Sequence, residues 1–366
     1  MESMRVLQVI NNLDTGGAER LLLDSIPKFI DNDIEVELLL LNGSDFPFLE
    51  MLKQKNLCKV HTLGTHSVYN PFLTFKIFKF FRQFDVLHVH LFPSLYWVSI
   101  AKMLSFSRVR LIYTEHSTSN NRRNSWLFNI LDQIVYRKYA KIITISNDVD
   151  TLLRNYLKMK PSSFRIISNG VNLEKISRIT PHDRTDFTSS EEKIVIQVSN
   201  FSKQKDQYTL IKAICHLKAN VKLLLVGDGE LKTECEALVG QLGLEDKVEF
   251  LGVRMDVIEL LKMADVAVLS THYEGLSLSS IEALACKKPL IASRVPGLSS
   301  VVEHAGILFP PGDAKALAQI IDELLSDQQL YEKTANLCYK RAQDFGLDTM
   351  IKEHIKLYKE VCPNLS

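Results

Sequence analysis

Residues 6–26, VLQVINNLDTGGAERLLLDSI, contain the structural unit whose repetition decides the fold. The apolar run at residues 6–10 is followed by a loop with two glycines, and then by a segment in which Leu21, Leu22 and Ile26 share one helical face. Comparable apolar runs recur at residues 36–41, 86–89, 111–113, 142–145, 194–198, 222–226, 248–250, 266–269 and 290–292. Because such runs suit strands buried on both faces of a parallel sheet, their alternation with helical segments predicts a doubly wound α/β architecture.

The alternation is interrupted at residues 176–192. This stretch is polar, contains a single proline and has no apolar period, so it indicates a linker between two domains. We therefore expect two Rossmann-like domains facing across a cleft, the first over residues 1–180 and the second over residues 190–346. Residues 347–366 include apolar residues at helical intervals, and we expect this helix to pack back on the N-terminal domain. Open α/β sheets bind ligands at the carboxyl ends of their strands, so we expect the functional residues in the loops that follow strands.

Composition and charge exclude several classes of function. The 366 residues are 46% hydrophobic and 24% charged, as in an ordinary globular chain, and a net charge of +1 gives no electrostatic reason to expect a nucleic-acid partner. There is no uncharged apolar run of about 18 residues that would predict a spanning helix, and the first residues lack the pattern of a secretory signal, so we expect a cytoplasmic protein. None of the six cysteines is in a Cys-x-x-Cys pair or at zinc-ligand spacing from a histidine, and we predict no metal site.

Two glycine loops follow predicted strands. Gly16 and Gly17 lie between the first strand and its helix, and Gly227 and Gly229 follow the run at residues 222–226. Glycines at such places let the backbone approach a ligand, with the N–H groups of the next helix directed at an anion, although a tight turn explains the same pattern. Neither loop has the Gly-x-Gly-x-x-Gly fingerprint of dinucleotide-binding proteins, which counts against an NAD site.

The most informative stretch is residues 273–285, YEGLSLSSIEALA, which follows the run at residues 266–269. Its serines are suited to cap a helix, and the first N–H groups of that helix would suit a diphosphate. Glu274 lies in the loop and Glu282 in the helix, a separation of about 12 Å for eight positions along a helix. At that separation the two carboxylates suit hydroxyls at two ends of an extended ligand better than a single reacting atom.

Glu274 and Glu282 fit the Glu-x7-Glu motif of retaining glycosyltransferases of family 4, which have the GT-B fold, and the chain resembles this family over nearly its whole length. Further segments resemble the family in the same order: residues 15–19 (TGGAE), 114–116 (TEH), 145–147 (ISN), 169–171 (NGV), 201–206 (FSKQKD), 227–230 (GDGE) and 296–297 (PG). The resemblance implies that the N-terminal domain binds the acceptor and that the C-terminal domain binds a nucleotide-sugar donor, for which we expect a UDP-sugar.

The resemblance also implies roles for individual residues. Glu274 would contact the donor sugar, Glu282 would accept hydrogen bonds from the ribose hydroxyls, and Lys205 would bind the donor diphosphate. The fixed ammonium of Lys205 would stabilise the negative charge that develops on the departing nucleoside diphosphate, so we expect neither a metal nor a cofactor. The other donor-binding residues implied are Gly16, Gly17, Asn200, Gly227, Gly229, Gly275, Leu276 and Ser277.

Asn200 departs from the family pattern, because the family usually has an arginine at this place before Phe-Ser. An asparagine donates a hydrogen bond but carries no charge. Diphosphate binding would then depend more on Lys205, on the helix end, or on an arginine from elsewhere, such as Arg294 or Arg254.

Three histidines lie near the ends of strands in the N-terminal half. His116 matches a family histidine close to the reacting sugar, where it would hydrogen-bond the donor sugar and the acceptor; a turn histidine is the alternative. We interpret His88 and His90 as structural, and we expect only one of them to face the ligand side of the strand. No side chain stands out as a nucleophile, and the usual proposal for retaining relatives is a front-face substitution in which the leaving phosphate takes the acceptor proton.

Residues 72–84, FLTFKIFKFFRQF, combine a basic stripe of Lys76, Lys79 and Arg82 with aromatic and aliphatic side chains. This pattern is typical of an amphipathic helix on an anionic membrane, and equally of a sheet-covering helix with a solvated basic face. Other basic residues of the N-terminal half favour the membrane: Arg122, Arg123, Arg137, Lys138 and Lys141. A membrane surface would suit an acceptor linked to a polyprenyl diphosphate.

We therefore expect a metal-independent retaining enzyme that moves a hexosyl or N-acetylhexosaminyl group from a UDP-sugar to a glycan or polyprenyl-diphosphate-linked acceptor, in bacterial surface polysaccharide assembly. It would work in the cytoplasm, either free or peripheral on the inner face of the plasma membrane. Two alternatives stay open. One is another enzyme of the same fold, such as a sugar-nucleotide epimerase or a phosphorylase, and the other is a non-catalytic sugar-nucleotide-binding protein.

Overall fold

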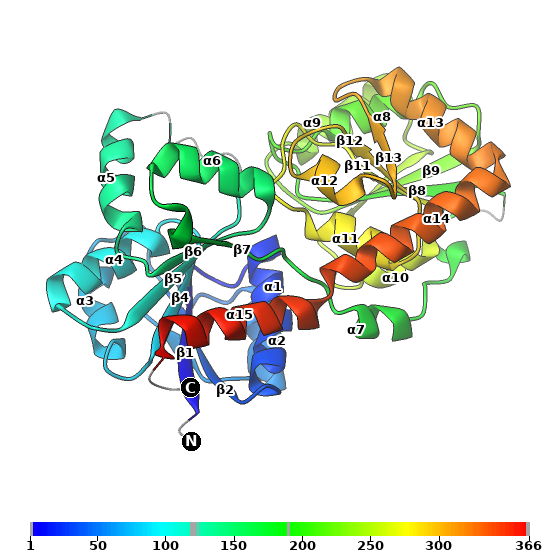
Figure 1. Cartoon of the computed structure of the whole chain (residues 1–366). Coiled ribbons are helices and arrows are strands. Elements are labelled where there is room, and N and C mark those ends of the chain that lie inside the picture. The colour runs from blue at the N-terminus through cyan, green and yellow to red at the C-terminus, as the bar shows by residue number, and fades with distance from the viewer. Residues whose placement is uncertain (1–2, 118–122, 124, 189–190, 364–366) are drawn as a thin grey trace. The chain divides into compact units, whose positions relative to one another are not determined.

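The structure, a computed structural model, describes residues 3–117, 123, 125–188 and 191–363. The chain forms two compact units (Figure 1): Met1–Gly170 together with Leu347–Ser366, and Val171–Gly346. Each unit is built on one sheet whose strands are all parallel, with helices in the connections between successive strands. The prediction of two Rossmann-like, doubly wound α/β sheets is confirmed.

Within the described residues, the sheet of the first unit has seven strands in the order β3-β2-β1-β4-β5-β6-β7. The strands are β1 (Met4–Ile10), β2 (Ile34–Leu40), β3 (Val60–Thr62), β4 (Val86–His90), β5 (Arg110–Glu115), β6 (Lys141–Thr144) and β7 (Phe164–Ile166). The helices between them are α1 (Gly17–Ile30), α2 (Pro47–Lys55), α3 (Leu73–Ile77), α4 (Ser94–Ser105), α5 (Trp126–Tyr136) and α6 (Asn147–Leu157). Val6, Leu7 and Val9 of β1 are all fully buried, as expected for a central parallel strand. The strand order reverses between β1 and β4, which places the ligand-binding switch point there.

The second unit repeats this plan with six strands, in the order β10-β9-β8-β11-β12-β13. The strands are β8 (Lys193–Val198), β9 (Val221–Val226), β10 (Val248–Gly252), β11 (Val266–Leu269), β12 (Leu290–Ser293) and β13 (Ile307–Phe309). The helices are α7 (Leu173–Arg178), α8 (Gln207–Ile214), α9 (Lys232–Leu242), α10 (Val257–Met263), α11 (Leu278–Ala285), α12 (Leu298–Val302), α13 (Ala314–Ser326) and α14 (Gln328–Ala342). Here the strand order reverses between β8 and β11, so this is the switch point of the second sheet.

The last helix, α15 (Leu347–Val361), returns the chain to the first unit and packs along α1. The ring of Tyr358 lies 5.7 Å from that of Phe29 on α1. The chain leaves the first unit after Gly170 and re-enters it at Leu347, and the N–H of Val171 donates to the carbonyl of Phe345 at 2.9 Å. The two passages of the chain are therefore joined to each other.

The segment interpreted as a linker, residues 176–192, belongs to the second unit, and the boundary lies at Gly170 instead of between residues 180 and 190. The segment includes the end of α7 and a short 3-10 helix, Arg184–Asp186. Its polar side chains bond to the second unit, since Nη2 of Arg184 lies 2.9 Å from Oδ2 of Asp265. A polar, aperiodic composition indicated a free linker because sequence alone does not show that these side chains have partners. Residues 189 and 190 lie outside the described residues.

Residues 72–84 form α3 and a 3-10 helix, Phe78–Phe80, instead of one long helix. Ile77, Phe80 and Phe84 are buried in the core of the first unit, so these apolar side chains are not available to a membrane. The basic stripe of Lys76, Lys79 and Arg82 is exposed. In the part of the chain that the structure describes, no helix has the length and apolar character needed to cross a bilayer.

Candidate active site

The switch point of the second sheet joins two loops into one platform. The loop after β8 and the loop after β11 are connected by an antiparallel bridge between Lys205 and Thr271. Oγ1 of Thr271 donates to the carbonyl of Gln204 at 2.9 Å, and the N–H of Asp206 donates to the carbonyl of Ser270 at 3.1 Å. The N–H of His272 also donates to the carbonyl of Gln204 at 2.9 Å, so main-chain bonds join the two loops and hold Lys205 and its neighbours on a fixed frame.

Lys205 and Glu274 form a buried ion pair on this platform. Nζ of Lys205 contacts Oε2 of Glu274, and the two side chains are only 10% and 11% exposed. Gln204 donates from Nε2 to Oε1 of the same carboxylate at 3.2 Å and to the carbonyl of Tyr273 at 3.0 Å. A buried ion pair is costly to desolvate, so one at the ligand-binding edge of a sheet favours a functional role over a purely stabilising one. The structure brings these two predicted site residues into direct contact.

Gly227 and Gly229 allow the loop after β9 to approach the loop after β8. Their φ angles are +135° and +151°, a region that side chains disfavour. A Cβ at Gly227 would lie 2.1 Å from the carbonyl oxygen of Ser199, and one at Gly229 would lie 2.4 Å from that of Phe201. Gly227 is half-buried, and Gly229 and Asn200 are exposed.

Gly297 supports the Glu274 loop from the loop after β12. Its φ is +77°, and a Cβ there would lie 2.3 Å from the carbonyl oxygen of Glu274 and 2.4 Å from that of Gly275. Sequence reasoning did not single out Gly297 as a site residue. The signal for it was the Pro-Gly pair at residues 296–297, which belongs to the family pattern.

Helix α11 begins directly after the Glu274 loop. Ser277 is its N-cap, and Oγ of Ser277 accepts a hydrogen bond from the N–H of Ser280 at 3.4 Å. Leu276 and Gly275 are buried in the loop before the cap. Glu282 lies half-buried in the helix itself, so the two glutamates are in the loop and in the helix, as their spacing indicates.

The two arginines that were candidates to replace the missing charge at Asn200 differ in their surroundings. Arg254 is held by Asp256, with Nε 2.8 Å from Oδ1, and this pairing keeps the pKa of Asp256 well below its usual range. Arg294 directly follows β12, is exposed, and has no ion-pair partner among the residues that the structure describes. Of the two arginines, Arg294 is therefore the one whose guanidinium group is available to bind an anion at the carboxyl edge of the sheet.

In the first unit, Gly16 and Gly17 lie where the chain passes from β1 into α1. Gly16 is the N-cap of α1, and a Cβ there would lie 2.2 Å from Oε2 of Glu19, whose carboxyl group folds back over the start of the helix. The pKa of Glu19 is raised to about 7, mainly because its carboxyl group is buried; the backbone N–H of Glu19 acts to lower this pKa and the nearby Asp14 acts to raise it. The sequence analysis assigned Glu19 no role, although it belongs to the TGGAE segment that resembles the family.

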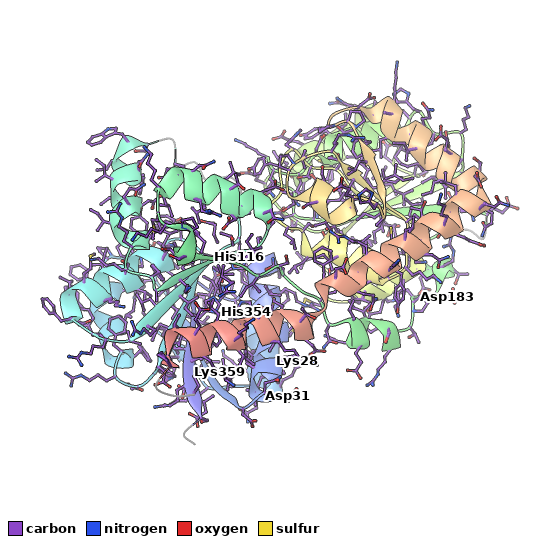
Figure 2. The ribbon with its side chains drawn as sticks, viewed as in Figure 1. Lys28, Asp31, His116, Asp183, His354 and Lys359 are labelled. Atoms are coloured by element: carbon purple, nitrogen blue, oxygen red, sulfur yellow. The ribbon has the colours of Figure 1, made fainter. Side chains whose placement is uncertain are left out.

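His116 follows β5 and belongs to a cluster of histidines to which α15 contributes His354 (Figure 2). Nε2 of His116 is 3.2 Å from Nδ1 of His90, and the ring of His88 is 4.3 Å from that of His90 and 5.5 Å from that of His354. The expectation that only one of His88 and His90 faces the ligand side is wrong, because residues two positions apart on a strand share a face.

Burial keeps this cluster uncharged. It lowers the pKa of His116 and of His354 to about 4, and it lowers the pKa values of His88 and His90 well below their usual range. At neutral pH each ring therefore has one donor nitrogen and one acceptor nitrogen.

The predicted site residues are thus divided between the units, with Gly16, Gly17 and His116 in the first and all the others in the second. Among the described residues, no three histidine, cysteine, aspartate or glutamate side chains are grouped so as to hold a metal ion.

Comparison with known families assigns each half of the chain. Residues 15–175 match the family described as Glycosyltransferase Family 4, and residues 180–343 match the family described as Glycosyl transferases group 1. Together the two matches include every predicted site residue.

Three known proteins illustrate the relationship. The N-acetyl-alpha-D-glucosaminyl L-malate synthase of Bacillus anthracis is 28% identical over 76% of both chains. The N-acetylgalactosamine-N,N'-diacetylbacillosaminyl-diphospho-undecaprenol 4-alpha-N-acetylgalactosaminyltransferase of Campylobacter jejuni is 27% identical over 95% of this chain and 97% of its own. The crystal structure of HepE from Anabaena in complex with UDP and glucose is similar at a TM-score of 0.87, with 24% identity over 98% of this chain and 100% of HepE. This chain therefore belongs to the glycosyltransferases of the GT-B fold, with a family 4 N-terminal half and a group 1 C-terminal half.

Proposed function

We propose that the protein moves a hexosyl or N-acetylhexosaminyl group from a UDP-sugar, with retention of configuration, to a polyprenyl-diphosphate-linked glycan in surface polysaccharide assembly. The observation that carries the donor half of this proposal is the Lys205–Glu274 pair at the switch point of the second sheet. An ammonium group has three N–H donors, so Lys205 retains donors for a diphosphate while it contacts Glu274. The complex of HepE with UDP and glucose supports a UDP-linked donor.

The rest of the donor site is proposed from the loops around this pair. The backbone at Gly227 and Gly229 would lie along the nucleotide, and the start of α11 would direct N–H groups at the diphosphate. Glu282 would accept hydrogen bonds from the ribose hydroxyls. Arg294 would supply part of the charge that Asn200 does not provide.

Retention follows in this proposal from substitution on one face of the sugar. The bond between the anomeric carbon and the diphosphate oxygen breaks, the acceptor oxygen bonds to the anomeric carbon on the same face, and the acceptor proton moves to the departing phosphate oxygen. Lys205 lowers the barrier because its charge is in place before the negative charge develops, so no metal is needed for this task. Glu274 is engaged by Lys205 and Gln204, which suits holding a sugar hydroxyl better than attacking the sugar.

The acceptor is proposed to be lipid-linked because the first unit has a surface suited to an anionic membrane. Ten of the nineteen large apolar side chains that are exposed in the described residues lie between Tyr69 and Ile134. The strongest concentration is on α5, where Trp126 is 76% exposed and Ile130 and Ile134 follow it at helical spacing. Helices α3, α4 and α5 pack side by side in the first unit (Figure 1), so these exposed side chains lie on neighbouring helices. Exposed apolar patches of this extent mark interaction sites.

The charge of this surface has a single sign. Between residues 51 and 147 the sequence has three acidic residues, Asp85, Glu115 and Asp132. Each carboxylate is bonded inside the protein: Asp85 to the N–H of Arg5, Glu115 to Arg123 and Asp132 to Tyr156. The exposed charged residues of α3 to α5 and their loops, among those described, are Lys76, Lys79, Arg82, Arg108, Arg110, Arg137 and Lys138. Arg122 lies outside the described residues, and Lys141 is paired with Glu360.

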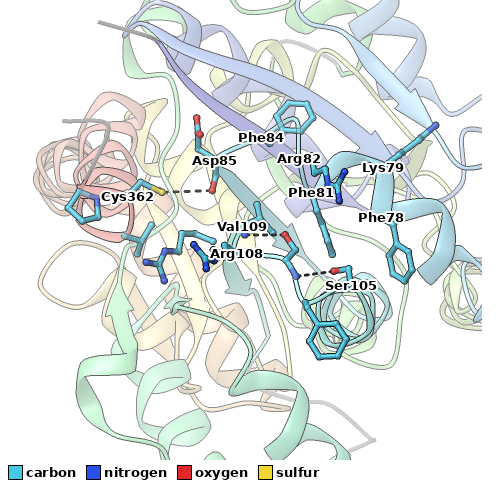
Figure 3. Close-up of a pocket in the computed structure, with 15 residues that line it drawn as sticks. Phe78, Lys79, Phe81, Arg82, Phe84, Asp85, Ser105, Arg108, Val109 and Cys362 are labelled. Carbon is cyan, nitrogen blue, oxygen red and sulfur yellow. Dashed lines mark hydrogen bonds between the residues drawn. The ribbon is translucent and has the colours of Figure 1, made fainter.

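A hollow of about 910 Å³ at the edge of this surface concentrates the positive charge (Figure 3). Arg82, Arg108 and Arg110 line it, together with the 91% exposed Phe106. None of the three arginines has an ion-pair partner in the described part of the chain. Apolar side chains with unpaired arginines between them are what the headgroups and upper acyl chains of anionic lipids would contact.

Membrane binding is tested by sedimentation with vesicles. We expect the protein to sediment with phosphatidylglycerol-containing vesicles and to stay in the supernatant with pure phosphatidylcholine. Changing Trp126→Ser together with Ile130→Ser should abolish sedimentation, whereas Leu337→Ser, which alters an exposed leucine of α14, should not. Wild-type protein that never sediments would contradict the membrane part of the proposal.

The transfer activity is tested with a panel of nucleotide sugars and a polyprenyl-diphosphate-linked acceptor, with NMR to identify the anomer formed. The proposal predicts turnover of one UDP-sugar to a product of the donor's own configuration, without added metal and in the presence of EDTA. A product of inverted configuration would contradict retention, and epimerised donor without acceptor would favour the epimerase alternative.

A further inference from the structure

The histidine cluster of the first unit is part of a continuous chain of buried hydrogen bonds that begins at His116. Nε2 of His116 is 3.2 Å from Nδ1 of His90, and Nε2 of His90 is 2.9 Å from Oε1 of Gln8. Nε2 of Gln8 donates to the hydroxyl of Tyr358 at 3.2 Å. That hydroxyl is 2.7 Å from Nδ1 of His88.

The donors in this chain run in one direction. The amide oxygen of Gln8 is only an acceptor, so Nε2 of His90 must carry the proton, which leaves Nδ1 of His90 as an acceptor. Nε2 of His116 must then be the donor in the bond between the two histidines. On the other side, the Gln8 amide group donates to Tyr358, and the Tyr358 hydroxyl proton is directed at His88. His88 in turn donates from Nε2 to Oγ1 of Thr114 at 2.7 Å.

We propose that this chain holds His116 as the tautomer protonated at Nε2, so that its Nδ1 lone pair is presented to a hydroxyl of the bound substrate. Gln8, His90 and Tyr358 are then positioning residues, and none of them needs to touch the substrate. The inference rests on the proposed function for the identity of that hydroxyl, which would belong to the donor sugar or the acceptor.

Three observations support the assignment. Gln8, His90 and Tyr358 are 1%, 5% and 0% exposed, so bulk water does not compete for these bonds. Nδ1 of His116 has no bonding partner among the described residues, which leaves it available to a ligand. The lowered pKa values of the histidines keep the rings neutral, as a chain with one donor per ring requires.

The hydrogen-bond chain also gives the last helix, α15, a role at the site. Tyr358 belongs to α15, which is separated from the rest of the first unit by the whole of the second unit in sequence. If the Gln8 amide reversed, every bond in the chain would reverse with it, and His116 would carry its proton on Nδ1. The Tyr358 hydroxyl is bonded to both Gln8 and His88, so it couples the orientation of the Gln8 amide to the tautomer of His88.

The tautomer is measured directly with protein labelled with ¹⁵N in histidine, in long-range ¹H–¹⁵N correlation spectra, with a His116→Asn variant to assign the signals. We expect wild-type His116 to be protonated at Nε2 at neutral pH. Tyr358→Phe and, from another element, Gln8→Met should each produce a mixture of tautomers at His116 and lower kcat for transfer about tenfold. The affinity for UDP should not change in these variants, since under the proposed function the second unit binds the diphosphate.

Tyr139→Phe is the matched control. Its hydroxyl is equally buried and donates to the carbonyl of Leu95 at 2.6 Å, outside the chain, so both the tautomer and kcat should stay as in wild type. A wild-type His116 protonated at Nδ1, or a tautomer that neither Tyr358→Phe nor Gln8→Met alters, would overturn the proposal. The spectra need no substrate, so they report on the hydrogen-bond chain even if no nucleotide sugar is turned over. Absence of transfer activity in the wild type would contradict only the proposed function.

Discussion

The two sheets carry different chemistry at their carboxyl edges. The second sheet places a cation, Lys205, against the carboxylate of Glu274, both buried and held on main-chain hydrogen bonds. The first sheet places Gln8, His90 and His116 at the corresponding edge, where burial keeps the rings neutral. A buried charge suits an ionic ligand group, and an oriented chain of neutral donors and acceptors suits uncharged hydroxyls. Under the proposed function, we expect the second unit to bind the diphosphate and the first to bind uncharged hydroxyl groups.

The largest expected effect comes from removing the charge from the second edge. Lys205→Met combined with Glu274→Gln should lower kcat/KM for transfer by about 100- to 1000-fold, because the diphosphate leaves without a fixed positive charge beside it. Steady-state kinetics with the best UDP-sugar of the panel would measure this. A kcat/KM within threefold of the wild-type value would show that the Lys205–Glu274 pair has no important role in transfer.

The double variant is preferred to Lys205→Ala for a structural reason. The single change would leave the buried carboxylate of Glu274 without its cation, which typically costs about 3–5 kcal/mol of stability. Loss of activity could then reflect unfolding. The paired neutral change avoids this, and a thermal unfolding curve close to that of wild type confirms that the comparison is fair.

Two glycines with similar φ angles test the loop that supports the Lys205–Glu274 pair. Gly297→Ala should destabilise the protein by about 3 kcal/mol or more and lower activity, because the new Cβ would collide with the carbonyl oxygens of Glu274 and Gly275. Gly312 has a φ of +80° and open space around it, so Gly312→Ala should cost only about 1 kcal/mol and leave activity unchanged. Urea unfolding and transfer assays on both variants separate backbone strain from the collision, and equal losses would show that the contact with the Glu274 loop is unimportant.

The first unit also contains a carboxyl group, that of Glu19, which changes its charge near neutral pH. Glu19 has a folded pKa of about 7 against an ordinary value of 4.5, so the folded state retains a proton that the unfolded state has released between these values. Its contribution is therefore fully present below about pH 4.5 and is lost as pH rises through 7, a change of up to about 3 kcal/mol. Glu19→Gln should remove this slope, so that the variant gains stability over wild type between pH 5 and pH 8. Parallel unfolding midpoints for the two proteins over this range would contradict the assignment.

The smallest expected effect concerns the charge that replaces the arginine missing at Asn200. Arg294→Gln should weaken UDP binding about tenfold, the usual scale for one charged hydrogen bond. Arg254→Gln, in which the altered arginine is held by Asp256, should leave UDP binding unchanged. If titration calorimetry found the reverse order, the source of the second positive charge would have to be sought in the loop after β10.

Much of the fold could be predicted because the central strands are long enough to leave a pattern. The apolar runs that contain Val6 and Val195 are buried on both faces, and their uninterrupted apolar sequence predicted strands correctly. The three-residue strands β3, β7 and β13 were not predicted, since strands this short have too few apolar residues to show any period. The domain boundary was misplaced for a related reason: Arg184 looks like a linker residue until its partner Asp265, far away in the sequence, is known.

The candidate site was predictable to the extent that each residue belongs to a local motif. Lys205 and Glu274 could be named separately from their motifs, but their direct contact depends on the pairing of two loops that are 69 positions apart. The Gln8–Tyr358 hydrogen bond spans 350 positions and has no local signature at all. The apolar face of α5 was not predicted, because apolar residues at helical spacing do not reveal from sequence alone whether they are buried or exposed.

We propose above all that the second unit binds a diphosphate through Lys205, and the ratio of UDP to uridine affinity measures this contribution most directly. Titration calorimetry should show that wild-type protein binds UDP at least about 100-fold more tightly than uridine, and that the ratio falls below about tenfold in the Lys205→Met/Glu274→Gln variant. Equal affinities for the two ligands in wild type, or a ratio that the variant leaves intact, would contradict the account.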